Sequence, residues 1–186
     1  MSAQPAPQQL FTIEEYLERE EKAAYKSEYY KGEIFAMAGG TPPHSAISVN
    51  ILYALMGRLR KKCRVYGSDM RVHIPVEQLF TYPDISVVCG KREFFRDKAL
   101  MNPVVIVEVL SDSTEDYDRG TKFKLYGKIA SLREYVLVSQ ETQAVDVFRR
   151  NAEGRWELFQ YADQDDVELA SVECTLTMEE IYEDSE

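Results

Sequence analysis

Three charged residues stand where apolar side chains are expected, namely Asp84, Glu108 and Lys122. Glu108 follows the apolar run 104–107, in a segment predicted to be a strand covered on both faces. A lone carboxylate there is costly unless it is paired or binds a cation. Asp84 follows Pro83 and opens another predicted strand. Two carboxylates on neighbouring strands can share a divalent cation, and oxygen ligands suit Mg²⁺ or Mn²⁺.

Lys122 lies in a predicted helix over residues 114–129. At about 100° per residue, Lys122 falls on the side of Leu125 and Ile129, whereas Lys124 points to water. A lysine directed inward needs an anion, and the two carboxylates are available. The alternative is that its long side chain bends round the helix edge into solvent. The residue pattern alone does not decide between the two.

The overall composition is that of a globular protein. The chain has 186 residues, of which 45% are hydrophobic, and this length fits one domain. We expect a flexible tail over residues 1–10 and a single domain over 11–186. Without an apolar run long enough to span a bilayer or a secretory signal, the expected location is cytoplasmic, away from membranes. The three cysteines match no zinc or disulfide pattern, so free thiols are expected.

Charge is unevenly distributed along the chain. The net charge is −10, yet residues 1–150 carry +1 and the C-terminal segment 151–186 carries −11. A basic cluster comprises Arg58, Arg60, Lys61, Lys62, Arg64 and Arg71. Phosphate binding is one interpretation, with Arg58, Lys61, Lys62 and Arg71 as candidate nucleic-acid contacts. The other is that these are solvated charges suited to a helix C-terminus.

The hydrophobic pattern predicts a mixed α/β domain built on one sheet. A capping box formed by Thr12 and Glu15 marks the first helix. The predicted elements are a helix at 13–22, a strand pair or a helix-to-strand segment within 25–38, a helix at 44–62, a strand at 64–76 with a kink near Gly67, strands at 82–89 and 103–110, a helix from Ser113 or Thr114 to 129, a strand at 133–139, and a hairpin of 143–150 with 156–161.

Several stretches carry a resemblance to a known family. They are FTIEEYL at 11–17, GEI at 32–34, SDMRV at 68–72, YPDISVV at 82–88 and the 37-residue block that begins at Asn102. The chain resembles the PD-(D/E)xK nuclease superfamily, and within it the Uma-type branch of restriction endonucleases. The resemblance implies a restriction-endonuclease-like core, a central mixed β-sheet flanked by helices. It also implies Mg²⁺-assisted (or Mn²⁺-assisted) hydrolysis of DNA phosphodiester bonds.

The chain departs from the superfamily pattern at two points. The superfamily lysine should stand two residues after Glu108, but Leu110 occupies that position. In the Uma-type branch the basic residue lies on the following helix, which here gives Lys122. The predicted helix at 44–62 also lacks the acidic residue of related nucleases, and Glu28 or Glu33 is expected to supply that charge.

The resemblance assigns a role to each site residue. Asp84 and Glu108 hold the metal, with the Val109 carbonyl as a further ligand and Glu33 completing the shell. Lys122 orients the attacking water or stabilises the developing charge.

His44 stands at a predicted helix start, where backbone N–H groups favour anions, so one interpretation is a phosphate contact. The other interpretation is a capping or loop residue.

Three functions from different classes remain open at this point. One is an active endonuclease acting on DNA. Another is an inactive nuclease fold that binds nucleic acid, and the last is a metal-stabilised interaction protein. A homodimer is expected in each case. The set of Asp84, Glu108 and Lys122 favours the active nuclease, whereas the net charge of −10 favours the interaction protein.

Overall fold

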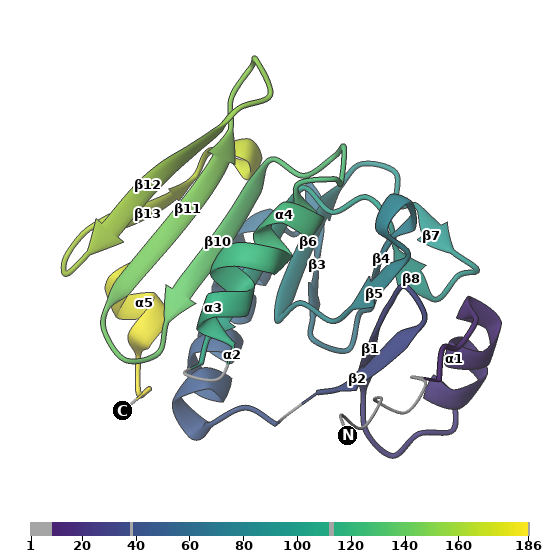
Figure 1. Cartoon of the computed structure of the whole chain (residues 1–186). Helices are drawn as coiled ribbons and strands as arrows, with labels where there is room; N and C mark the ends of the chain where they lie inside the picture. Colours follow the sequence, from purple (N-terminus) through teal and green to yellow (C-terminus); the bar gives the residue numbers. More distant parts are fainter. Residues whose placement is uncertain (1–8, 38, 112–113, 186) are drawn as a thin grey trace, which may run out of the picture.

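Two six-stranded mixed sheets form the framework of the computed structural model, which describes residues 9–37, 39–111 and 114–185 (Figure 1). The central sheet has the order β12 (Trp156–Ala162), β11 (Ala144–Arg150), β10 (Glu134–Ser139), β9 (Val105–Leu110), β6 (Ile85–Cys89) and β3 (Cys63–Gly67). Its β9 and β10 are parallel, and its other neighbours are antiparallel.

The second sheet has the order β2 (Glu33–Ala36), β1 (Ser27–Tyr30), β5 (Leu79–Thr81), β4 (Val72–Ile74), β8 (Ala99–Leu100) and β7 (Phe94–Phe95). A short ribbon of β13 (Asp166–Leu169) and β14 (Cys174–Thr177) completes the strands. The helices are α1 (Ile13–Glu20), α2 (Pro42–Leu59), α3 (Glu115–Tyr117), α4 (Phe123–Tyr126) and α5 (Met178–Tyr182), with 3₁₀ turns at Pro75–Glu77 and Ala170–Val172. Among the helices of the described residues, none is both long and apolar enough to cross a membrane.

Strand β9 lies at the middle of the fold, and both of its faces are buried, as its sequence predicts. Val105, Val107 and Val109 pack on one face with α2, α5 and the β13–β14 ribbon. Ile106 and Leu110 pack on the other face with α4 and the second sheet. Side chains alternate along a strand, so Glu108 points with Ile106 and Leu110 toward α4.

Helix α1 covers the outer face of the second sheet. The predicted capping box is present, with Thr12 Oγ1 accepting from the Glu15 N–H and Glu15 accepting from the Thr12 N–H. Tyr16 of this helix packs against Tyr29 and Phe80. Helix α1 is thereby packed onto β1 and β5 of the second sheet.

The expectation of one sheet was wrong. The predicted strand 64–76 is two strands, and β3 joins the central sheet while β4 joins the second. A turn after Gly67, closed by the bond from the Met70 N–H to the Gly67 carbonyl at 3.0 Å, sends the chain from one sheet to the other. The strands that make up the rest of the second sheet are two to four residues long, too short to show a clear period.

The predicted helix 114–129 is interrupted. It consists of α3, a π-helical turn at Asp118–Lys122, and α4, which ends at Tyr126. Thr114 stands at the N-cap position without a side-chain capping bond. The alternative cap, Ser113, lies outside the described residues.

The expectation of free thiols was wrong for two of the three cysteines. Cys63 and Cys89 face each other across the β3–β6 pair and form a disulfide. Cys174 is free and buried. Their separation of 26 residues in the sequence hides the pairing, which arises from the register of two adjacent strands.

Reduction of this disulfide should destabilise the protein, because the cross-link limits the freedom of the unfolded chain. We expect dithiothreitol to lower the unfolding free energy by about 2–4 kcal/mol. The Cys63→Ser/Cys89→Ser protein should be equally destabilised without reductant and insensitive to it. Urea unfolding of both proteins with and without dithiothreitol measures this, and a wild type that ignores the reductant contradicts it.

Candidate active site

Asp84 and Glu108 face each other across two antiparallel strands. The register pairs Ile85 with Val107, so the next residues outward, Asp84 and Glu108, are directly opposite and share one face of the sheet. The Asp84 N–H donates to Glu108 Oε2 at 3.3 Å. The Val109 N–H donates to Asp84 Oδ2 at 2.8 Å. The two carboxylates therefore lie on adjacent strands and are locked together by backbone bonds, as the sequence predicts.

Lys122 points inward and contacts three carboxylates. Its Nζ lies 3.0 Å from Glu108 Oε1, 3.1 Å from Asp118 Oδ1 and 3.8 Å from Glu28 Oε1. The side chain is buried, and Lys124 on the same helical segment is exposed. The prediction that Lys122 meets an active-site carboxylate is confirmed, and the alternative of a solvent-directed side chain is wrong.

The π-helical turn explains how both Asp118 and Lys122 reach the interior. They are four residues apart, and both are buried. The Asp118 carbonyl also accepts a hydrogen bond from Tyr135 of β10 at 3.1 Å. Such a turn inside a helix is rare and is found frequently at functional sites.

A hydroxyl chain links the two sheets beneath Lys122. Tyr126 donates to Glu108 Oε1 at 2.7 Å, and its oxygen lies 3.4 Å from Thr81 Oγ1. Thr81 in turn donates to Glu28 Oε1. Glu108 and Glu28, on different sheets, are thereby held on either side of Lys122.

His44 approaches the carboxylates from the other side of the central sheet. It lies in the first turn of α2, and its Nε2 is 3.2 Å from Asp84 Oδ2. Its backbone N–H is capped by Thr41 Oγ1 at 3.2 Å. A Cβ at Gly40 would lie 2.8 Å from His44 Nδ1, so a larger residue would displace the ring. The sequence left open a phosphate contact or a capping role, and the side chain instead contacts Asp84.

The electrostatic balance of this cluster is negative. Glu108, Asp118 and Glu28 surround Lys122, and Asp84 lies between Glu108 and His44. Burial raises the pKa of Glu108 to about 8, and neighbouring Asp84 and Asp118 add to the rise against the opposing effect of Lys122. Burial lowers the pKa of Lys122, but the surrounding carboxylates outweigh it and leave the pKa well above its ordinary value. The cluster thus retains a charged lysine and has an excess of acidic groups.

Glu33 lies on the same hairpin as the acidic residue that contacts Lys122. It begins β2 and pairs with Tyr30, whereas Glu28 of β1 is the residue of this hairpin within 4 Å of Lys122. Among the candidates left open, the geometry favours Glu28. Asp118 and Tyr126 were missed, although Asp118 stands one helical turn before Lys122 in the sequence.

The basic residues proposed as nucleic-acid contacts do not form one surface. Arg58 and Lys62 pair with Glu180 and Glu173 of the C-terminal segment. Lys61 is exposed just after α2. Arg71 lies elsewhere, its guanidinium 5.5 Å from the Tyr16 ring and 5.4 Å from the Tyr82 ring. The interpretation of solvated or paired charges fits Arg58 and Lys62 better than phosphate binding does.

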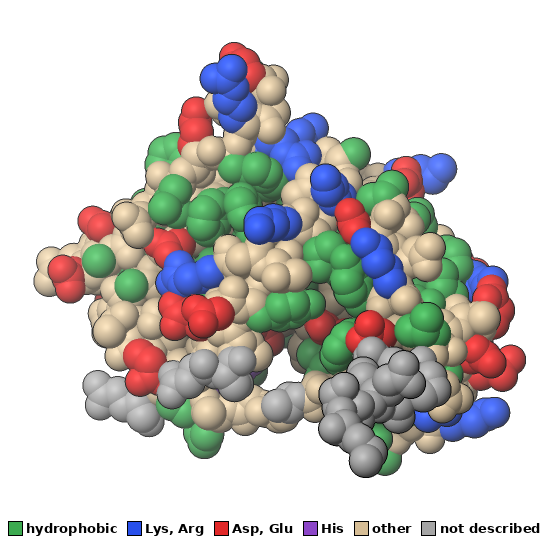
Figure 2. All heavy atoms as spheres, viewed as in Figure 1, with side chains coloured by type: hydrophobic (Ala, Val, Ile, Leu, Met, Phe, Trp, Pro, Cys, Tyr) green, Lys and Arg blue, Asp and Glu red, His purple; other side chains and the backbone are tan. Residues whose placement is uncertain are grey.

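One acidic turn of the C-terminal segment lies away from the carboxylate cluster. The turn between β12 and β13, which holds Asp163 and Asp165, is at the left edge of Figure 1, beyond β11. The cluster lies between the α3–α4 segment and the β1–β2 hairpin, where Figure 2 shows a hollow with acidic side chains at its rim. The repulsion of phosphate by Asp163 and Asp165 is therefore kept at a distance.

The donors of the site are compatible with a hard divalent cation. Within the described residues, no three or more His, Cys, Asp or Glu side chains are grouped as a ready metal site. Asp84 and Glu108 supply two carboxylates, and Mg²⁺ commonly uses one or two carboxylates while keeping several waters. In β-strands the N–H and C=O of one residue point to the same side, so the Val109 carbonyl also faces the Asp84 strand. The excess of negative charge favours a cation there.

Comparison with known proteins identifies the family. Residues 13–179 match the Uma2 family model, described as "Putative restriction endonuclease". The chain belongs to the Uma2 family. An uncharacterised protein of Synechocystis sp., slr1290, is 38% identical over 178 residues, covering 95% of this chain and 94% of that one. A second from the same organism, sll1609, is 33% identical over 154 residues, covering 81% and 87%.

A solved structure shares the fold of this Uma2 protein. It is a crystal structure described as a "putative nuclease belonging to DUF820" from Anabaena variabilis, with a TM-score of 0.73 and 19% sequence identity. The match covers 92% of this chain and 97% of that chain. The mixed α/β nuclease-like fold predicted from the sequence is confirmed, with two large sheets in place of one.

The contact between His44 and Asp84 should give stability a specific pH dependence. The hydrogen bond to Asp84 raises the pKa of His44 above its ordinary value of 6.5, so the folded state binds the proton more tightly than the unfolded state. This stabilisation is complete below that ordinary value and is lost as pH rises through the raised one.

In EDTA, the wild type should therefore lose more stability than His44→Gln does as the pH rises from about 6 to about 9, a range that spans the histidine pKa. Glu108, whose pKa is also raised, contributes in the same direction in both proteins. Urea unfolding across this range measures the difference. Parallel pH profiles for the two proteins would show that the contact is not formed in solution.

Proposed function

We propose that this Uma2 protein is a divalent-metal-dependent endonuclease that hydrolyses DNA phosphodiester bonds. The observation that carries the proposal is the opposition of Asp84 and Glu108 at one end of a strand pair, with the Lys122 ammonium 3.0 Å from Glu108. Buried ionisable groups brought together in this way are costly for stability, which is a mark of functional sites. The descriptions of the family and of the solved neighbour support nuclease activity.

Asp84, Glu108 and the Val109 carbonyl would hold Mg²⁺ or Mn²⁺. When bound, the cation would polarise the scissile phosphate and lower the pKa of a bound water. Tyr126 and Lys122 fix Glu108 by donating to the same oxygen, Oε1, which leaves Oε2 with only the long bond from the Asp84 N–H. Oε2 is thus the oxygen most available to a ligand.

Lys122 would act on the attacking water or on the developing phosphate charge. Lys122 donates a hydrogen bond to Glu108 Oε1, whereas its contact with Asp118 Oδ1 at 3.1 Å is an ion pair in which that oxygen accepts no hydrogen bond, and Glu28 at 3.8 Å is beyond hydrogen-bond range. The ammonium therefore keeps N–H groups for a water or a phosphate oxygen. Such a preorganised cationic donor in a buried site stabilises developing negative charge strongly.

The alternative is a nuclease fold that binds nucleic acid or a protein partner without cutting. The net charge of −10 favours the protein partner over nucleic acid, because a negative charge repels phosphate. The same set of variants separates the two functions, since a binding protein does not depend on the Asp84–Glu108 pair.

Nicking of supercoiled plasmid with Mg²⁺ or Mn²⁺ tests the proposal. Asp84→Asn and Glu108→Gln should abolish cleavage because each removes a metal ligand. Lys122→Met should reduce the rate by about 100-fold or more, the scale for losing one charge-stabilising group. Glu28→Gln should weaken cleavage more than Glu33→Gln, since Glu28 is the residue beside Lys122.

The matched control is Lys124→Met, which removes an exposed lysine of the same helical segment. It should cleave like the wild type, and EDTA should stop both. If all proteins nick equally, the activity comes from a contaminating nuclease and the proposal fails. It also fails if the wild type and Lys124→Met are both inactive on double- and single-stranded DNA with either metal.

A further inference from the structure

The outward face of α2 carries a row of exposed apolar side chains. Val49, Tyr53 and Met56 are 58%, 81% and 50% exposed, and they follow one another at helical spacing. Gly57 continues the row, and a Cβ placed there would meet no heavy atom within 4 Å. Contiguous apolar surface of this kind marks an interaction site more often than isolated exposed residues do.

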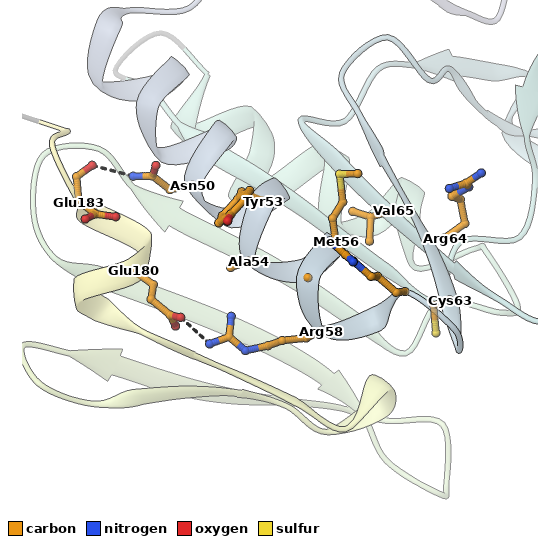
Figure 3. Close-up of a pocket in the computed structure, with 12 residues that line it drawn as sticks. Asn50, Tyr53, Ala54, Met56, Arg58, Cys63, Arg64, Val65, Glu180 and Glu183 are labelled. Carbon is orange, nitrogen blue, oxygen red and sulfur yellow. Dashed lines mark hydrogen bonds and ion pairs between the residues drawn. The ribbon is translucent and has the colours of Figure 1, made fainter.

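A cavity of about 580 Å³ opens beside this row. It is walled by α2, by the start of β3 and by the C-terminal helix α5 (Figure 3). Tyr53 and Met56 lie at its centre, between the Arg58–Glu180 ion pair on one side and Arg64 on the other. The surface is therefore concave and apolar in the middle, with charges at its margins.

The charges are of opposite sign at the two ends. Arg60 and Arg64 line the end near β3, and neither forms an ion pair within the described residues. Glu183 lines the other end, where Asn50 Nδ2 donates to the Glu183 carbonyl at 2.7 Å. This places Glu183 level with Asn50, about 15 Å along α2 from Arg60 at 1.5 Å per residue.

This arrangement is complementary to itself under a two-fold axis. A two-fold axis that crosses α2 at the height of Leu55 sets the two α2 helices antiparallel. A residue a given number of positions before Leu55 on one helix then faces the residue the same number of positions after Leu55 on the other. Tyr53 then faces Gly57 of the partner subunit, whose missing side chain leaves room for the ring. Glu183, at the level of Asn50, faces Arg60 of the partner subunit. Apolar contact and charge pairing are satisfied together.

We propose that the face formed by Val49, Tyr53, Met56, Gly57, Arg60 and Glu183 is the interface of a homodimer, with a second copy of this chain as its occupant. Two α2 helices pack antiparallel, Tyr53 is the central anchor, and two symmetric Arg60–Glu183 pairs close the margins. Tyr53 stands nine residues after His44, so at about 100° per residue the two point to opposite sides of α2 and the interface does not cover the carboxylate cluster. The proposal does not depend on nuclease activity.

Sedimentation velocity of the full chain tests this interface. The wild type should form a dimer, and Tyr53→Ala should raise the dimer dissociation constant at least about tenfold, as loss of a central aromatic anchor does. Arg60→Glu should also weaken it, because Glu183 of the partner subunit would then face a like charge. The double variant Arg60→Glu/Glu183→Arg should restore it, since the pair is re-formed with its signs exchanged.

Two exposed residues outside this face serve as matched controls. Tyr25→Ala removes a tyrosine that is 68% exposed, and Arg155→Glu reverses an exposed arginine in the β11–β12 turn, and both should dimerise like the wild type. A wild type that remains monomeric would leave the cavity to another ligand and overturn the proposal. So would a dimer unaffected by Tyr53→Ala, or a double variant no tighter than Arg60→Glu alone.

Discussion

The buried ion pair of Glu108 and Lys122 is the constraint on which the site depends. Glu108 is a carboxylate in a strand covered on both faces, and Lys122 is a buried lysine, so each needs a partner of opposite charge. The structure meets both needs with one contact of 3.0 Å and surrounds it with Tyr126, Asp118 and Glu28. Because these groups come from β9, α4, the π-helical turn and β1, the pair ties the two sheets together.

The sequence predicts the central part of this arrangement because the anomaly is local. Glu108 interrupts an apolar run, and Lys122 falls on the apolar side of its helix, so each is visible within a few residues. Asp118 and Tyr126 escaped although each stands four residues from Lys122, because an acidic residue near a helix start is ordinarily solvated and a tyrosine on an apolar helix face ordinarily packs in the core. The second sheet escaped because its strands of two to four residues carry no measurable period. The Cys63–Cys89 pairing escaped because strand register is a long-range property.

The distribution of charge follows from the same architecture. The acidic segment 151–186 forms β12, which is the edge strand of the central sheet, and the β13–β14 ribbon and α5, which pack on one face of that sheet. They take up part of the basic cluster through Arg58–Glu180 and Lys62–Glu173. Arg60 and Arg64 stay unpaired among the described residues, and they border the apolar face of α2 rather than the carboxylate cluster. The carboxylate cluster and the α2 face are therefore separate surfaces, the first acidic and the second bordered by unpaired arginines.

The central claim is that Asp84 and Glu108 bind a divalent cation, whose affinity the nearby positive charge of Lys122 lowers. Isothermal titration of Mn²⁺ into the metal-free protein tests this most directly. The account predicts one ion per chain for the wild type, at least about tenfold weaker binding for Asp84→Asn and for Glu108→Gln, and equal or tighter binding for Lys122→Met, which removes a competing positive charge. A wild type that binds no ion, or substitutions at Asp84 and Glu108 that leave its affinity unchanged, would contradict the account.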